Sequence, residues 1–387
     1  MLMRGKGFVV LAVVTVAVVI GAMFVVQRDP AQAPEVGGLL FPGLLARIND
    51  VSQVDVRTGS EPFRLERKGR DWVAPARSDY PLDGDKIHKL LVGAAGLERL
   101  EPKTDDPARF DELGLRDPGE PDARSTEFSL RAGDTLLAQL IVGERRPAKG
   151  DPNRTEYFVR VPGEQRSWLV RGTLPDRADE LVDWLRQSVA EISGSRIARV
   201  RVHHPDGETL TAVRDAPGSG DFRYAELPDG AKMSGAWLIN DIGRVLTDLK
   251  LEEVQPAAQA GAPAADAVEA VTETFDGLRV RLRAWRDGER TLATLRAEFD
   301  EALVRKGADG EPPAGLLAAA AVREEAQAFD ARWQPWVYEL PDYKGDYLHR
   351  RQDDLIEKPE QAPAAPPAEG GTAPPAPAAP QDAKPAS

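Results

Sequence analysis

One order of predicted elements occurs twice in the chain, and it limits the possible folds more than any other feature. The second copy begins about 146 residues after the first. In each copy, paired short strands precede an aromatic strand and a capped helix with one apolar face. The first copy has strands at 51–56, 63–67 and 70–73 and a helix capped by Asp83; the second has strands at 197–202, 209–214 and 221–224 and a helix capped by Ser234. We therefore predict an α+β fold of duplicated units, each a meander of antiparallel β-hairpins with a packing helix.

Further elements follow in each copy. Alternation of apolar and polar residues predicts strands, and apolar residues at steps of three and four predict helices. The added strands are at 126–131, 136–142, 157–161, 167–170, 278–285 and 290–299, and helices are expected from Leu181 and across 316–333. We assign 47–190 to the first repeat and 191–356 to the second, with a mobile Ala/Pro/Gly linker at 255–270. Residues 357–387 are Ala/Pro-rich and are predicted to form a disordered tail.

The N-terminal region contains an apolar stretch that begins at Phe8, ends at Val26 and includes no charged residue. As a helix it would span roughly 28 Å, close to the hydrocarbon thickness of a bilayer. Arg4 and Lys6 precede it, so the positive-inside rule assigns 1–29 to a cytoplasmic tip and transmembrane anchor. Residues 30–46 then form a spacer. We predict a single-pass protein of the inner (cytoplasmic) membrane with its bulk in the periplasm.

A cleaved signal peptide is the alternative to this anchor. Residues 31–33 have the small-x-small form of a cleavage site. Pro34 would then follow the cut after Ala33, where proline is unfavourable. The apolar stretch is also longer than the roughly 7–15 residues of a signal-peptide core. The sequence favours the retained anchor, and export is expected in either case.

Charge and motif content argue against several classes of function. With 50 Lys and Arg against 63 Asp and Glu, the formal net charge of −13 disfavours nucleic acid as a partner. The absence of cysteine removes disulfides and a thiol nucleophile. The chain has no phosphate-binding Gly-rich loop, no GxSxG and no HExxH motif. His203 and His204 are adjacent, so on a strand they would point to opposite faces. We therefore expect no metal, no cofactor and no enzymatic activity.

An aromatic cluster near the end of the folded region is the candidate contact site. Its members are Trp333, Trp336, Tyr343 and Tyr347. Aromatic rings offer a large contact area at low cost in side-chain entropy, so they suit a glycan or a protein partner. The alternative is that Trp336, Tyr338 and Leu340 alternate along a final strand and bury one face against the sheet. The alternation favours this second interpretation, while Tyr343 and Tyr347 are freer to be exposed.

Several segments together resemble the family called domain of unknown function 4340, which is found in membrane-anchored bacterial envelope proteins. They are the N-terminal anchor, Arg70-Asp-Trp72 with the helix at 83–97, Phe110-Asp-Glu-Leu-Gly-Leu-Arg-Asp-Pro118, Leu140-Ile-Val-Gly143, Tyr157-Phe-Val-Arg160, Ser167-Trp-Leu-Val170 and Trp336-Val-Tyr-Glu-Leu-Pro-Asp-Tyr-Lys344. The resemblance covers roughly residues 45–355. It implies an accessory subunit linked to ABC-type transport systems, including those auxiliary to gliding motility, and it supplies no catalytic residues.

Three functional hypotheses follow from these observations. The first is a non-enzymatic, membrane-anchored extracytoplasmic protein that acts as an auxiliary component of an ABC-type transport or envelope-assembly system. The second is an envelope protein that binds cell-wall glycan or polysaccharide through the aromatic cluster. The third is a hydrolase that uses carboxylates scattered along the sequence. The first hypothesis requires the membrane and protein partners, and the second requires glycan.

Overall fold

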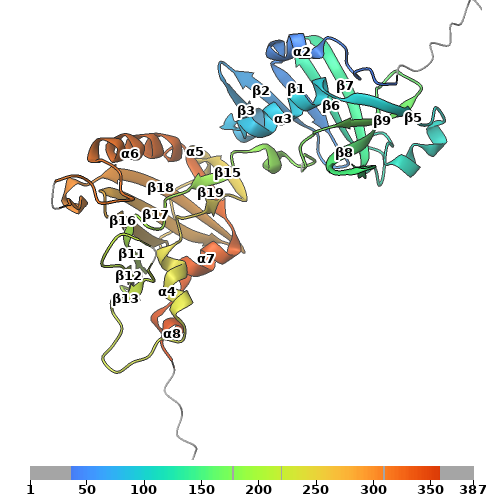
Figure 1. Ribbon diagram of the computed structural model, residues 1–387. Coiled ribbons are helices and arrows are strands. Elements are labelled where there is room, and N and C mark those ends of the chain that lie inside the picture. The colour runs from blue at the N-terminus through green and yellow to red at the C-terminus, as the bar shows by residue number, and fades with distance from the viewer. Residues whose placement is uncertain (1–35, 177, 219, 308–309, 358–387) are drawn as a thin grey trace, which may run out of the picture.

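The computed structural model describes residues 36–357 except 177, 219, 308 and 309. The predicted anchor from Phe8 to Val26, the cleavage question at Ala33 and all of the predicted tail after residue 357 lie outside these residues. Within the described ranges, no helix has the length and apolar character that crossing a membrane requires. The described chain forms two lobes, which we call the first lobe (36–187) and the second lobe (188–357) (Figure 1).

The first lobe is built on one antiparallel sheet. Its strand order is β4-β3-β2-β1-β6-β7-β8-β9-β5. The strands are β1 (Gln53–Arg57), β2 (Phe63–Lys68), β3 (Asp71–Ala74), β4 (Tyr80–Pro81), β5 (Glu98–Pro102), β6 (Thr126–Ala132), β7 (Thr135–Ala148), β8 (Asp151–Arg160) and β9 (Ser167–Gly172). Two helices, α2 (Leu44–Arg47) and α3 (Gly84–Ala95), pack on this sheet.

The second lobe is built on an eight-stranded antiparallel sheet and also contains a separate strand pair. The sheet order is β13-β12-β11-β16-β17-β18-β19-β15. The strands are β11 (Ile197–His203), β12 (Thr209–Val213), β13 (Arg223–Tyr224), β15 (Glu253–Pro256), β16 (Val268–Thr274), β17 (Leu278–Asp287), β18 (Arg290–Phe299) and β19 (Trp336–Leu340). The helices are α4 (Ala236–Gly243), α5 (Ala257–Ala260), α6 (Ala319–Trp333), α7 (Asp342–His349) and α8 (Gln352–Leu355), and the strand pair is β10 (Ser188–Ala190) with β14 (Leu249–Lys250).

Apart from β4, the two sheets have the same topology. Strands β3-β2-β1-β6-β7-β8-β9-β5 of the first lobe correspond in order to β13-β12-β11-β16-β17-β18-β19-β15 of the second. The last pair of strands matches even in detail, because Pro102 is paired with Trp168 in the first lobe and Pro256 with Trp336 in the second. The predicted α+β class with antiparallel sheets is therefore confirmed.

Helix α3 forms where the sequence predicts it. The Asp83 side chain accepts hydrogen bonds from the backbone N–H groups of Asp85 and Lys86, at 3.0 and 3.1 Å. This cap satisfies two of the donors that a helix start leaves free. The apolar positions of α3 are buried against the sheet, as their spacing predicts: Ile87, Leu90, Leu91 and Ala94. The equivalent helix α4 differs, since its N-cap residue is Gly235 and no side chain, including that of Ser234, caps it.

Three other segments differ from the sequence-based expectation. The segment expected as a mobile linker at 255–270 contains part of β15, all of α5 and the start of β16. Its alanines are small enough to pack closely on a second apolar cluster made by Trp285, Leu292 and Val337. The helix expected from Leu181 is only a 3₁₀ turn, Leu181–Trp184. Helix α6 begins at Ala319, three residues later than expected, and before it the backbone N–H of Leu317 donates to Asp276.

Aromatic stacking and one ion pair join the lobes. The Tyr80 ring of the first lobe meets the Trp336 ring edge-on, with 5.0 Å between centroids. The Arg77 guanidinium binds both carboxylate oxygens of Glu253, at 2.8 and 2.6 Å. Burial raises the pKa of Glu253, but the hydrogen bonds and charge of Arg77 together with the hydrogen bond from the Val254 N–H outweigh this effect, so the pKa lies below its usual range. These contacts, together with the hydrogen bond from the Leu251 N–H to the Gln187 carbonyl at 3.0 Å, hold the two sheets in one arrangement.

The buried Trp333 connects helix α6 to strand β10, and its truncation tests the packing. The indole Nε1–H donates to the backbone carbonyl of Val189, at 2.8 Å, and the side chain is fully buried. We expect Trp333→Ala to lower the free energy of unfolding by about 3–5 kcal/mol in urea denaturation. Trp237→Ala is the matched control, since Trp237 is 62% exposed; its cost should be about 1 kcal/mol or less. Equal costs for the two variants would contradict the burial of Trp333.

Candidate functional site

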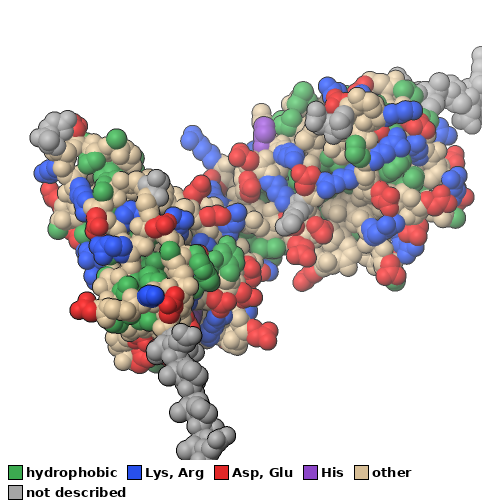
Figure 2. All heavy atoms as spheres, turned by 60° about the horizontal axis from the view of Figure 1, so that its bottom comes forward, with side chains coloured by type: hydrophobic (Ala, Val, Ile, Leu, Met, Phe, Trp, Pro, Cys, Tyr) green, Lys and Arg blue, Asp and Glu red, His purple; other side chains and the backbone are tan. Residues whose placement is uncertain are grey.

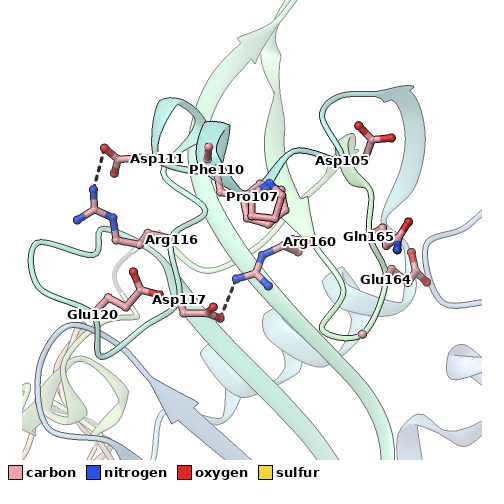
Figure 3. A pocket seen from close by; sticks show the side chains of 12 residues that line it. Asp105, Pro107, Phe110, Asp111, Arg116, Asp117, Glu120, Arg160, Glu164 and Gln165 are labelled. Atoms are coloured by element: carbon pink, nitrogen blue, oxygen red, sulfur yellow. Dashed lines mark hydrogen bonds and ion pairs between the residues drawn. The ribbon is translucent and has the colours of Figure 1, made fainter.

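A cleft of about 680 Å³ lies on one face of the first sheet (Figure 3). We call it the acidic cleft, because five carboxylates and two guanidinium groups line it. The charged lining residues are Asp105, Asp111, Asp117, Glu120, Glu164, Arg116 and Arg160. On the face that Figure 2 shows, acidic and basic side chains are intermingled on both lobes. The lining of the acidic cleft, in contrast, has a local excess of negative charge.

The segment at 103–120 builds most of this cleft by crossing the sheet from β9 toward β1. At its start, the backbone N–H of Lys103 donates to the carbonyl of Ser167 at 2.8 Å. At its end, the carbonyl of Pro118 accepts from Arg57 at 3.1 Å. Between these points Leu115 is fully buried, so one apolar side chain fixes the segment to the sheet. The segment contains the Phe110 to Pro118 motif found in the sequence.

Gly143 of β7 makes this close approach possible. A Cβ atom at this position would lie 2.4 Å from the carbonyl oxygen of Leu113 and 2.8 Å from that of Gly114. Such distances are too short for any side chain. Gly114 itself has a φ of 65°, in the left-handed region that favours glycine. The segment at 110–118 therefore packs directly against Gly143. This one contact accounts for both the motif at 110–118 and the glycine that ends the motif at 140–143.

Arg160 forms the floor of the acidic cleft. Its guanidinium donates to Asp117 at 2.8 Å and to the carbonyl of Leu115 at 3.2 Å, and it lies 4.9 Å from the centre of the Phe110 ring. Its side chain comes from β8 and is almost fully buried. A buried cation needs such partners, because desolvation without them is costly. The contacts with the motif at 110–118 therefore hold the Arg160 side chain in place, and the same contacts fix the position of the motif.

The remaining charges leave the rim negative. Arg116 is occupied by Asp111 at 2.9 Å and by the carbonyl of Pro121 at 2.7 Å. Asp105 and Glu164 form long ion pairs with arginines outside the cleft lining, Arg166 at 3.6 Å and Arg99 at 3.9 Å. Among the residues that the structure describes, Glu120 has no ion-pair partner. The lining thus holds more carboxylates than guanidinium groups, an arrangement that attracts Lys or Arg side chains of a partner.

The structure divides the four predicted aromatic residues between two locations. Trp333 is fully buried and Trp336 is half-buried against Tyr80, so both belong to the packing between and beneath the lobes. Trp333 is therefore not available for contact with a glycan or a partner. Tyr343 is 48% exposed on α7, and Tyr347, half-buried, lies one turn away with 5.7 Å between ring centroids.

Trp237 of α4 joins these two tyrosines and was missed by the sequence interpretation. The Arg350 guanidinium lies 5.2 Å from the Trp237 ring centre and 4.6 Å from that of Tyr347. Arg350 is held by Asp241 at 2.9 Å. We call the rings of Trp237, Tyr343 and Tyr347 the aromatic surface. One signal was present in the sequence: Trp237 lies beside the apolar stripe of its helix and not within it, which predicts exposure of a large ring.

The two adjacent histidines do not form a metal site. In the described part of the chain, no group of three or more potential ligands could hold a metal ion. His204 is buried, and this burial lowers its pKa. His203 is exposed and its Nδ1 lies 3.0 Å from the Thr209 hydroxyl. The pair has the divergent orientation that adjacent strand positions impose.

Comparison with known proteins gives one match. A family model described as Domain of unknown function (DUF4340) matches residues 72–266. No curated protein and no solved structure matches the chain. The matched range contains the whole acidic cleft, Tyr80 and Glu253 of the lobe junction, and Trp237 of the aromatic surface.

Substitution of Gly143 tests how the cleft is built. We expect Gly143→Ala to displace the segment at 110–118, because the added methyl group meets two backbone carbonyls. Hydrogen exchange of the amides in that segment should become at least about tenfold faster, equivalent to roughly 1.4 kcal/mol of lost local stability. Gly84→Ala is the control, since nothing lies within 4 Å of a Cβ there. Unchanged hydrogen exchange of these amides in Gly143→Ala would contradict the close packing of the segment at 110–118 on Gly143.

Proposed function

The chain belongs to the family described as Domain of unknown function (DUF4340), and from this premise we propose that it is a non-enzymatic accessory protein of the bacterial envelope. In this proposal the stretch from Phe8 to Val26 anchors it in the inner membrane, and both lobes lie outside the cytoplasm. It acts as an auxiliary component of an ABC-type transport or envelope-assembly system. The resemblance of its motifs to membrane-anchored envelope proteins supports this class of function.

The acidic cleft is the observation that most favours a binding role. Its floor is the buried Arg160 side chain, paired with the exposed Asp117, and its rim includes Glu120, which has no ion-pair partner among the described residues. A fixed, charged hollow of this kind selects a partner by complementary charge and guides its approach. We propose that a basic segment of a partner subunit occupies it. The net charge of −13 is consistent with a basic partner.

The equal topology of the lobes supports a second element of the proposal, that the chain arose by duplication of one unit. The junction then gives the duplicated chain a fixed spacing between its two contact surfaces. The acidic cleft belongs to the first lobe and the aromatic surface to the second. A rigid two-lobed spacer suits a protein that arranges other subunits, since both contacts are presented in one geometry.

Co-purification tests the accessory role. The full chain, extracted in mild detergent from its own cells, is expected to bring down transporter or envelope-assembly subunits. Glu120→Lys should reduce the recovered partner about tenfold, because it places a like charge against a basic segment. Glu289→Lys is the control, since Glu289 is exposed at the β17–β18 turn of the second lobe.

Two outcomes count against this proposal. Recovery of a lone monomer would contradict the accessory role itself. Recovery of partners that is equally strong with Glu120→Lys and with Glu289→Lys would contradict only the use of the acidic cleft. Circular dichroism of both variants establishes that each remains folded, which is expected because neither side chain is buried.

The aromatic surface favours one alternative function, binding of cell-wall glycan. Tyr343 and Trp237 expose much of their rings, and sugar rings pack on such faces. Arg350 and Asp241 lie beside them and could form hydrogen bonds to hydroxyl groups. This arrangement retains two of the four residues predicted from the sequence and adds Trp237.

Sedimentation with purified peptidoglycan tests this alternative. If the aromatic surface binds glycan, Trp237→Ala with Tyr343→Ala should reduce the pelleted fraction about tenfold, equivalent to roughly 1.4 kcal/mol. Leu317→Ala is the control, because Leu317 is an exposed apolar residue elsewhere in the second lobe. Absence of pelleting, or pelleting that the double substitution leaves unchanged, would remove the glycan hypothesis in this form.

A further inference from the structure

Exposed apolar side chains are concentrated around helix α2 of the first lobe. Eight large apolar residues are exposed in the described part of the chain, and five of them belong to this lobe. They are Val36, Leu39, Leu45, Val92 and Leu136. We call them the α2 surface. Isolated exposed apolar residues need no explanation, but a group on neighbouring elements indicates a contact.

Packing of α2 brings these residues together. The helix packs against α3, which carries Val92, and against β7, which Leu136 nearly begins. Leu44 of α2 is buried in the core, so the adjacent Leu45 faces outward, 61% exposed. Leu39 is fixed by an antiparallel bridge to Glu98. The α2 surface is therefore part of the ordered lobe and not a loose segment.

The position of the α2 surface in the chain identifies its occupant. Val36, the first described residue, is only ten positions after Val26, where the apolar N-terminal stretch ends. A fully extended chain of ten residue steps spans at most roughly 35 Å. If the stretch spans the membrane, Val36 and the adjoining α2 surface must stay close to the bilayer. The other lobe is under no such restriction, because the whole first lobe separates it from the anchor.

We propose that the α2 surface lies on the outer face of the lipid bilayer, with Leu45 and Leu136 in contact with the boundary between headgroups and acyl chains. This proposal rests on the anchored state proposed above. Apolar side chains that enter this boundary leave water without needing a protein partner. Each contributes little alone, but the anchor keeps the surface at the membrane, so the contacts act within one molecule.

This contact would fix the direction in which the molecule extends. Helix α2 lies at one end of the two-lobed structure, whereas α4, α7 and α8 lie at the opposite end (Figure 1). With α2 on the bilayer, the second lobe and its aromatic surface extend away from the membrane. Attachment through the anchor alone would permit many orientations of the two lobes relative to the bilayer. Contact of the α2 surface with the bilayer would select one of them.

Site-specific quenching in nanodiscs tests the proposal on the full chain. The protein has no cysteine, so Leu45→Cys, Leu136→Cys and Leu317→Cys can each carry one environment-sensitive dye without background labelling. Leu136 and Leu317 are similarly exposed, 44% and 40%, but lie in different lobes. We expect spin-labelled lipid to quench the dyes at 45 and 136 at least about twofold more strongly than the dye at 317.

The outcomes separate this proposal from the one on which it rests. Equal quenching at the three positions, in protein that remains on the nanodisc in high salt, would overturn the α2 contact and leave the anchor intact. Protein that separates from the nanodisc in high salt would overturn the anchor, and the α2 contact with it. In the same protein, Leu45→Asp should abolish the excess quenching at 136 and leave the melting temperature unchanged. If the quenching persists, the surface does not act as one unit.

Discussion

One backbone interaction, used twice, holds the described chain together. In the first lobe, the segment that precedes the sheet pairs with the residues after helix α3: the N–H of Leu40 donates to Leu97 and that of Gly37 to Arg99, at 2.7 and 2.8 Å. In the second lobe, β10 pairs in the same way with β14, which follows helix α4. The first pairing attaches the N-terminal segment to its lobe. The second attaches the segment that arrives from the first lobe to the second lobe, so the position of α2 depends on the first pairing and the interlobe geometry depends on the second.

Most of the fold was predictable because its signals are local. Alternation placed most of the long strands, and Asp83 with its apolar stripe placed α3. The topological match supports the two-repeat interpretation, and in each lobe a lead-in segment precedes the first strand of the sheet. The errors arise where tertiary packing overrides composition. Ala/Pro/Gly content predicts a mobile linker, but the alanines at 257, 260, 264 and 267 pack on Trp285 because they are small. Ser234 is a good cap by type, yet its backbone N–H pairs with Leu355 and its side chain caps nothing.

The contact surfaces were less predictable, since each is assembled from distant parts of the sequence. The acidic cleft joins residues 105–120 to Arg160 and Glu164, which come together only because β8 and β9 form adjacent strands. The motif at 110–118 was visible in the sequence. Its packing on Gly143 was not, because it depends on the pairing of distant strands, which no local pattern encodes. The aromatic cluster shows the reverse case. Its members are close in sequence, and the structure separates them into the core, the lobe junction and the surface.

The prolines opposite Trp168 and Trp336 have a consequence for association between molecules. Both Pro102 and Pro256 belong to strands at a sheet edge, where unpaired N–H and C=O groups invite a strand from another chain. Proline has no N–H, so each edge ends in a residue that cannot continue a ladder. If the chain is anchored as proposed, it meets its own copies often, because diffusion is confined to two dimensions. Prolines at these edges would then keep neighbouring copies from merging their sheets, and the crowded membrane surface would hold separate molecules.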